Sequence, residues 1–169
     1  EGFAFLPITS FTMAITTFVG QNLGAKEYDR VKKGARFGIL SSVILAEAIG
    51  VVIYIFAPAL TAAFDRTPEV IMYGTDRARV EAFFFCLLAY SHAISAVLRG
   101  AGKSMVPMFV MLAFWCVIRV MIITIAGHII PGIEVVYWVY PITWGLSSIA
   151  FFIYYRKADW LRGFERQRF

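Results

Sequence analysis

The sequence predicts an all-α integral membrane protein, built as a polytopic bundle of about five transmembrane helices. Apolar residues make up 60% of the chain, its mean hydropathy is +0.72, and only 16% of its residues are charged. Soluble globular proteins carry roughly 25% charged residues. Apolar stretches of about 20 residues, the length that crosses a bilayer, recur along the chain. Most Lys and Arg residues lie in the connections between these stretches, which is typical of membrane proteins.

Five stretches are apolar and long enough to be membrane spans, at about residues 3–23, 37–64, 77–98, 106–128 and 136–155. The first has no charged start and no small-residue cleavage site, so a membrane helix is favoured over a signal peptide. The chain also lacks an initiator Met, and we expect it to be part of a longer protein. The third helix is expected to begin early, because Thr67 suits an N-cap and Pro68 the first helical position.

The distribution of cations predicts which helix ends face the cytoplasm. Twelve of the 16 Lys and Arg residues lie after the first span, between the third and fourth spans, or in the tail of residues 156–169. They are Lys26, Arg30, Lys32, Lys33, Arg36, Arg99, Lys103, Arg156, Lys157, Arg162, Arg166 and Arg168. The opposite connections contain only Arg66, Arg77 and Arg79. Because cytoplasmic loops are enriched in cations, we expect the two cation-rich connections and the C-terminus to be cytoplasmic. We also expect the protein to reside in the plasma (inner) membrane.

The run VGQNLGAKEYDRVKKGARFG, residues 19–38, is polar although both of its flanks are apolar. Gly24 is expected to end the first helix in the left-handed conformation that glycine readily adopts. A short helix is expected to follow at the membrane surface, with an apolar stripe formed by Tyr28, Val31 and Ala35. The alternative is an ordinary basic connection with no role beyond topology.

Two motifs carry a resemblance to a known family. GQNLGAKEYDRVKKGA, within residues 20–35, resembles the loop that follows the second helix of each half in the MATE family (multidrug and toxic compound extrusion). LRGAGKSMVPM, residues 98–108, is similar to that family's stretch between its tenth and eleventh helices. The order and separation of the motifs also match. The five spans would then be the last five helices of a twelve-helix MATE fold.

The resemblance implies a function. MATE proteins are secondary transporters of two six-helix bundles that export drugs and other organic cations in exchange for Na⁺ or H⁺. Residues 1–155 would supply most of the second bundle and residues 156–169 a basic cytoplasmic tail. The partners would be organic cations, membrane lipid and the missing N-terminal half of the same transporter. The first bundle and the seventh helix of the MATE fold would be absent from this chain. A carboxylate often implicated in the family lies on that seventh helix, so this chain alone should not transport.

Glu47 is the first candidate for substrate or ion binding. It lies near the middle of the second span, on the same face as Gly50 and Tyr54. Charged groups at membrane depth are costly and usually functional. An ionised Glu47 could bind Na⁺ or a cationic drug, and a protonated one could carry H⁺. The alternative is a structural acid that pairs with another helix.

The third span contributes two further candidates, Glu81 and His92. Steps of four and three residues would place a set of side chains on one helical face: Glu81, Phe85, Leu88, His92, Ser95 and Arg99. Such a face is expected to point towards the bundle or the cleft, where aromatic rings suit organic cations. A hydrogen bond between helices is the alternative for His92, and pairing with Arg77 is the alternative for Glu81.

Arg119 is the last candidate, because it lies more than halfway along the fourth span. It could pair with Glu47 or Glu81, or extend along the helix towards water. No catalytic residue, cofactor or metal site is expected, apart from Na⁺ at Glu47.

Other classes of function fit the sequence less well. A lipid-linked oligosaccharide flippase of related architecture would need several cations in its cleft, and a non-transport subunit would need no acid at Glu47. An intramembrane enzyme would need paired His or Asp residues, yet His92 and His128 are far apart in the sequence. The Lys and Arg residues form no continuous face for nucleic acid, and GAGK at residues 100–103 lacks full phosphate-loop spacing.

Overall fold

The computed structural model describes residues 2–129, 132–158 and 160–161. Its elements are α1 (Gly2–Gly24), α2 (Tyr28–Phe64), α3 (Pro68–Ala82), α4 (Phe85–Gly100), α5 (Met105–Met111), η1 (Leu112–Ile118), α6 (Arg119–Ile129) and α7 (Glu134–Lys157). The described part of the chain contains no strand, which confirms the all-α prediction.

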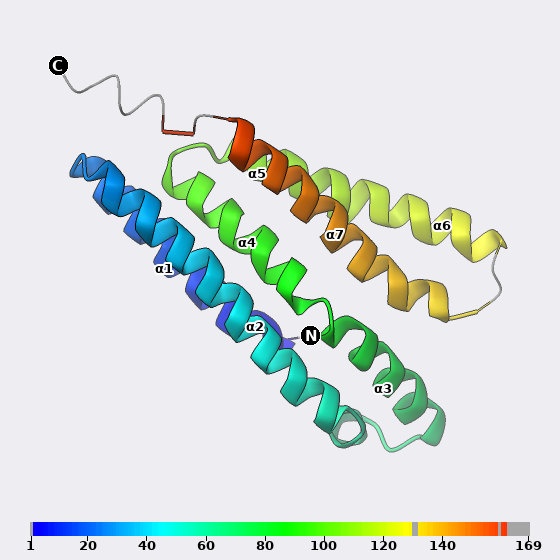
Figure 1. The fold of residues 1–169 in the computed structure, drawn as a ribbon. Helices are drawn as coiled ribbons and strands as arrows, with labels where there is room; N and C mark the ends of the chain where they lie inside the picture. Colours follow the sequence, from blue (N-terminus) through cyan, green and yellow to red (C-terminus); the bar gives the residue numbers. More distant parts are fainter. Residues whose placement is uncertain (1, 130–131, 159, 162–169) are drawn as a thin grey trace.

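The helices lie side by side along one long axis (Figure 1). The α1–α2 connection, the α4–α5 connection and the C-terminal end of α7 gather at one end of the bundle. The α2–α3 and α6–α7 connections lie at the other end. The cation-rich regions therefore meet at one end, apart from residues 162–169, which lie outside the described residues.

Three helices of the described chain are long and apolar enough to cross a membrane: Tyr28–Phe64, the joined helix Met105–Ile129, and Glu134–Lys157. The pair α3 and α4 adds a fourth if it is taken as one span, bent by 54°. These four correspond in position to the predicted spans from 37–64 onward. The helix α1 matches the predicted span 3–23 in position, and its crossing of the membrane stays a prediction.

The helix α1 ends at Gly24, as predicted, but a different residue adopts the left-handed conformation. Lys26 has a φ of 60°, and its N–H bonds to the carbonyl of Leu23. The N–H of Glu27 bonds to the carbonyl of Asn22, which completes a Schellman motif. The prediction for Gly24 was wrong by two residues because this motif places its left-handed residue beyond the last helical one.

The separate surface helix predicted after residue 25 is also wrong. The helix α2 begins at Tyr28 and continues without a break to Phe64. Val31 and Ala35, expected on a membrane-facing stripe, are fully buried in the main hydrophobic cluster. Gly34 lets the ring of Phe18 on α1 approach α2 closely, since a Cβ there would overlap that ring. This contact holds the start of α2 against α1.

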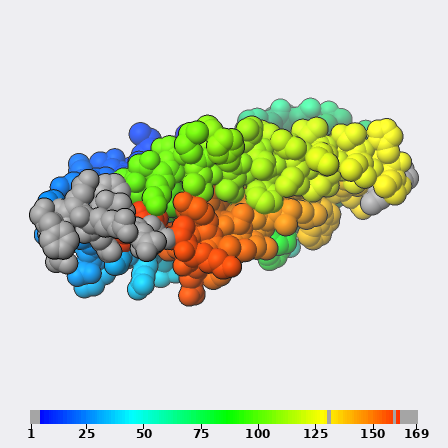
Figure 2. All heavy atoms as spheres, turned by 90° about the horizontal axis from the view of Figure 1, so that it is seen from above, coloured from blue at the N-terminus to red at the C-terminus, as the bar shows by residue number. Residues whose placement is uncertain are grey.

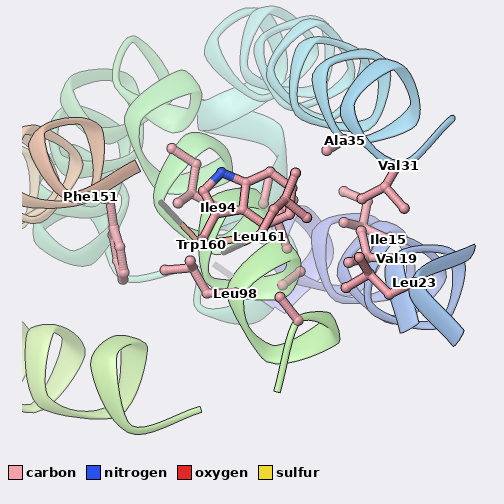
Figure 3. Close-up of a cluster of buried hydrophobic side chains, with 14 residues drawn as sticks. Ile15, Val19, Leu23, Val31, Ala35, Ile94, Leu98, Phe151, Trp160 and Leu161 are labelled. Carbon is pink, nitrogen blue, oxygen red and sulfur yellow. The ribbon is translucent and has the colours of Figure 1, made fainter. Parts of the chain in front are cut away.

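The helix α4 is the centre of the bundle. Residues 93–98 have no solvent exposure, and contacts with α1, α2 and α7 surround the helix. Figure 3 shows side chains from α1, the start of α2, α4 and α7 meeting in this cluster, together with Trp160 and Leu161. A second cluster joins Ile8, Ala46, Phe85, Leu88 and Trp144. Burial on all sides fixes α4 within the bundle.

The joined helix α5–η1–α6 lies on the outside of the bundle, packed mainly against α7 (Figure 2). Its middle seven residues, Leu112–Ile118, form a π-helix. Among its described residues only Pro107 is buried. Most of its large apolar side chains are exposed on the surface of the described bundle.

Candidate functional site

The predicted third span is divided by a break at Phe83 and Phe84, between α3 and α4. The two helices are bent by 54° across it. The prediction of one continuous face from Glu81 to Arg99 was therefore wrong, because the bend turns α3 away from the axis of α4. His92, Ser95 and Arg99 do share a face on α4, where Arg99 donates a hydrogen bond to the Ser95 hydroxyl at 2.8 Å.

Glu47 lies directly opposite this break. Its Oε2 accepts a hydrogen bond of 3.2 Å from the backbone N–H of Cys86, in the first turn of α4. Such N–H groups have no partner within their own helix, and the helix dipole favours a negative group there. The side chain is half-buried, and it lines a small hollow with Gly50 and Tyr54, the residues expected on its face.

Gly50 allows α2 to approach the break closely. A Cβ at this position would lie 2.5 Å from the carbonyl oxygen of Ala82, the last residue of α3. The absence of a side chain therefore brings Glu47, one turn earlier on α2, within reach of the N-terminus of α4. The local geometry gives Glu47 a structural role, as a capping carboxylate for α4.

Glu81 lies before the break, at the end of α3, and is only 3% exposed. Its Oε1 accepts a hydrogen bond from Arg77 Nε at 2.9 Å. The alternative interpretation of Glu81, pairing with Arg77, is thus observed. The guanidinium of Arg77 also lies 4.8 Å from the ring centre of Tyr140 on α7. Glu81 and Arg77 form part of the wall of an open groove of about 650 Å³ between α2 and α3.

The connection between α2 and α3 lies at the mouth of this groove. Thr67 occupies the predicted N-cap position and Pro68 starts the helix, but the Thr67 side chain forms no capping hydrogen bond. The Thr67 N–H instead donates to Asp65 Oδ1 at 2.8 Å. This backbone bond, with a smaller contribution from the Thr67 side chain, lowers the pKa of Asp65. Asp65 therefore stays ionised at the groove mouth.

His92 packs between two aromatic rings. Phe5 on α1 and Trp115 on η1 meet it edge to face, at centroid distances of 5.2 and 5.1 Å. Its Nε2 is buried and has no hydrogen-bond partner in the described part of the chain. The neighbouring rings give this atom no hydrogen bond, and a hydrogen bond between helices stays a prediction for His92.

Arg119 lies against α7. Its Nε and one terminal nitrogen donate to the hydroxyl of Thr143 at 3.3 and 2.8 Å. Its guanidinium carbon is 4.4 Å from the ring centre of Tyr140 and 5.5 Å from that of Trp115. The pairing expected with Glu47 or Glu81 stays a prediction, whereas the contact with two ring faces is a cation–π arrangement.

A small cavity, which we call the aromatic cavity, lies beneath Arg119. It has a volume of about 60 Å³ and is enclosed by α1, α4, α7 and the joined helix η1–α6. Its aromatic walls are Phe5, Phe85, Trp115, Tyr140 and Trp144. His92 touches two of these rings from outside. The cavity therefore combines ring faces with one cation that already lies against them.

Buried hydroxyls fix one wall of the aromatic cavity. The Ser91 hydroxyl on α4 lies 3.0 Å from that of Ser147 and 2.9 Å from that of Ser148, both on α7. Trp115 Nε1 donates to Ser147 at 3.1 Å, and Ser148 donates to the carbonyl of Leu87 at 2.9 Å. This network ties η1, α4 and α7 together, and a satisfied buried network favours one arrangement of the rings.

Of the four candidate residues, the structure places Glu47 and Glu81 beside the helix break and His92 and Arg119 beside the aromatic cavity. Sequence reasoning missed Trp115, Tyr140, Trp144 and the serine network. Tyr140 lies near the start of the last span, where aromatic residues are usually interfacial. The spacing of Trp144 and Ser147, one turn apart, is a signal of an inward face that could have been found.

Comparison with known proteins adds the family. A family model described as MatE matches residues 1–125. "Probable multidrug resistance protein YoeA" of Bacillus subtilis (strain 168) is 26% identical over 153 residues, which cover 89% of this chain. "Probable multidrug resistance protein NorM" of Halalkalibacterium halodurans is 26% identical over 164 residues, or 97% of the chain. The NorM protein of Thermotoga maritima is 27% identical over 110 residues, or 65% of the chain.

The matched part is only a fraction of each relative. It covers 33% of YoeA, 36% of the H. halodurans NorM and 24% of the T. maritima NorM. The chain thus spans about a third or less of the relatives' length. The all-helical bundle, the apolar spans and the family match over residues 1–125 agree with one another. This chain belongs to the MatE family.

Proposed function

We propose that the protein containing this chain is a secondary active antiporter that exports drugs or other organic cations in exchange for Na⁺ or H⁺. The observation that carries the proposal is the family match over residues 1–125, together with relatives named as multidrug resistance proteins. The activity belongs to the whole protein, because the chain covers only part of each relative. In this proposal the chain provides one wall of the transport path.

The aromatic cavity is the part of this wall suited to organic cations. Ring faces attract cations by electrostatics, most strongly where water is excluded. At about 60 Å³ the cavity is far smaller than the roughly 300–1,000 Å³ of pockets that bind drug-sized ligands. A drug would therefore bind only after the walls move apart, and the Arg119 guanidinium would have to leave the Tyr140 ring.

The coupling ion is proposed to act at Glu47. A half-buried carboxylate next to a helix break can exchange its backbone partner for Na⁺ or accept H⁺. Broken helices with free backbone groups are common at the ion and substrate sites of transporters. Glu81 is a weaker candidate, since Arg77 already neutralises it at 2.9 Å.

Transport by the full-length protein tests the proposal. Proteoliposomes loaded with a fluorescent monovalent cation are given an inward Na⁺ gradient, a pH gradient, or neither. Accumulation or release driven by one of the two gradients supports an antiporter. Movement of the dye that is equal under all three conditions would argue against coupling, and movement of a fluorescent lipid in its place would favour a flippase.

Removing the Arg119 charge is expected to tighten the binding of organic cations. Arg119→Met frees the faces of Tyr140 and Trp115 and removes a like charge, so the KM for the fluorescent cation should fall about fivefold. Arg79→Met is the matched control, because Arg79 lies 5.4 Å from the ring of Tyr54, outside the aromatic cavity. Equal KM values for the two variants would show that the aromatic cavity does not bind the organic cation during transport.

The predicted sidedness can be tested by cysteine labelling in intact cells. The native cysteines, including Cys86 and Cys116, are first replaced by alanine. A cysteine at Lys33, at the cation-rich end of the bundle, should be shielded from an impermeant thiol reagent. A cysteine at Thr67, at the opposite end, should react. A cysteine in the tail of residues 156–169 should be shielded like Lys33, and external labelling at Lys33 would reverse the topology.

A further inference from the structure

A second cavity, which we call the basic pocket, lies at the cation-rich end of the bundle, far from the aromatic cavity along the long axis. It has a volume of about 600 Å³ and lies between the start of α2 and the end of α7. Lys32 and Arg36 line it from α2, and Arg156 and Lys157 line it from α7. None of the positions discussed for transport contributes to it.

The wall of the basic pocket beyond α7 is held in place by packing. The N–H of Ala158 bonds to the carbonyl of Tyr154, and the N–H of Trp160 bonds to the carbonyl of Ala158. Trp160 stacks on Tyr155 with a centroid distance of 5.5 Å and an interplanar angle of 22°. Trp160 and Leu161 are 7% and 3% exposed, and Figure 3 shows both within the main hydrophobic cluster. The pocket is therefore a formed feature of the fold.

The described side chains of the basic pocket carry charge of one sign. All four charged side chains that line it are cations, and no carboxylate is among its described lining residues. Arg36, Arg156 and Lys157 are exposed, so their charged groups can reach a ligand at the rim. The guanidinium of Arg156 lies 5.2 Å from the ring centre of Phe152, a cation–π contact. Two arginines and two lysines from different helices thus converge on one space.

We propose that the basic pocket binds the phosphate group of an anionic phospholipid headgroup. Guanidinium groups match phosphate oxygens with paired, charge-assisted hydrogen bonds. Basic pockets between transmembrane helices, at the level of the headgroups, are a recurrent setting for such lipids. The volume is within the range of about 300–1,000 Å³ that holds small ligands. The bound lipid bridges α2 and α7, which both line the pocket although they are far apart in the sequence.

Lipid titration of the full-length protein tests this assignment. The detergent-solubilised protein is titrated with phosphatidylglycerol or phosphatidylcholine, and bound lipid is counted by native mass spectrometry. The pocket variant is Arg36→Gln with Arg156→Gln. The matched control is Arg30→Gln with Lys33→Gln, which removes the same charge from the same end of the bundle, at residues that do not line the pocket.

Wild type and control should prefer phosphatidylglycerol with the same Kd, and the pocket variant should bind it about tenfold more weakly, because its charge-assisted hydrogen bonds are lost. Equal weakening in both double variants would show general attraction to anionic lipid and overturn the proposal. If the protein binds neither lipid, and inorganic phosphate raises its melting temperature, the lipid assignment is overturned in favour of free phosphate. If the pocket variant does not fold, the variant Arg36→Lys with Arg156→Lys is used, because it keeps the charge. Unchanged binding of phosphatidylglycerol by this variant would overturn the role of the paired guanidinium hydrogen bonds.

Discussion

Glu47→Gln in the full-length protein is expected to reduce gradient-driven efflux strongly while the protein still inserts and folds. Glutamine keeps the shape of the side chain, and its carbonyl oxygen can still accept the hydrogen bond from the Cys86 N–H. The variant thus removes only the charge and the ability to bind Na⁺ or H⁺. Coupling free energies of about 1–3 kcal/mol correspond to changes of roughly 5- to 150-fold. The decrease in efflux, normalised to membrane expression, should lie within that range of fold-change.

Glu47→Ala separates this coupling role from the capping role. Alanine removes both the charge and the acceptor of the Cys86 N–H, so a purely structural Glu47 would give an active Gln variant and an impaired Ala variant. A coupling residue would give two inactive variants. Glu69→Gln, at an exposed acid in the first turn of α3, controls for a general effect of charge. If Glu47→Gln gives the same efflux as the wild type under both gradients, Glu47 is not the residue that couples transport to the ion.

Gly100→Ala is expected to destabilise the bundle by about 1–3 kcal/mol, the usual cost of an added methyl group in a packed interface. A Cβ at Gly100 would lie 2.7 Å from the carbonyl oxygen of Thr16 and 2.8 Å from the Cβ of Val19. Both atoms belong to residues of α1, so α1 must move away from α4. The hydrogen bond of 3.2 Å from the Thr16 hydroxyl to the Ala96 carbonyl would be strained as well.

Gly127→Ala is the control for Gly100→Ala. Gly127 lies in α6 with no atom within 4 Å of a Cβ, so alanine should only add helix propensity and raise stability by up to about 1 kcal/mol. Thermal unfolding of the two purified variants should therefore shift in opposite directions from the wild type. Equal melting temperatures would mean that α1 and α4 are less closely packed than the described contacts indicate.

Local sequence signals predicted much of the fold. Length and hydropathy located the helices, and Thr67 with Pro68 marked the start of α3 to the residue, because proline is favoured at the first helical position. The break at Phe83 and Phe84 could not be predicted in this way, since neither residue is a helix breaker. Its first free N–H groups face Glu47, which is 39 residues away in the sequence. A contact across α2 and α4 stabilises the break, and no local window contains it.

The candidate site was predicted in part for the same reason. Rare charged groups within apolar spans identified Glu47, Glu81 and Arg119, because their cost in lipid makes them conspicuous. Tyr140 and Trp144 are not conspicuous in a chain with 17% aromatic residues. Their role depends on α7 lying against η1 and α4, where Ser147 and Ser91 meet. Only the packing of three helices distinguishes the rings of the aromatic cavity from those that face lipid.

The π-helical stretch Leu112–Ile118 determines where the length of this chain can change during evolution. Deleting one residue from an α-helix turns everything beyond it by about 100°, since the helix has 3.6 residues per turn. In a π-helix the hydrogen bonds already span one residue more than in an α-helix. A one-residue deletion within 112–118 can thus convert this stretch to α-helix and leave α5 and α6 in phase. The same deletion between Arg119 and Ile129 would rotate the rest of α6 away from its contacts with α7.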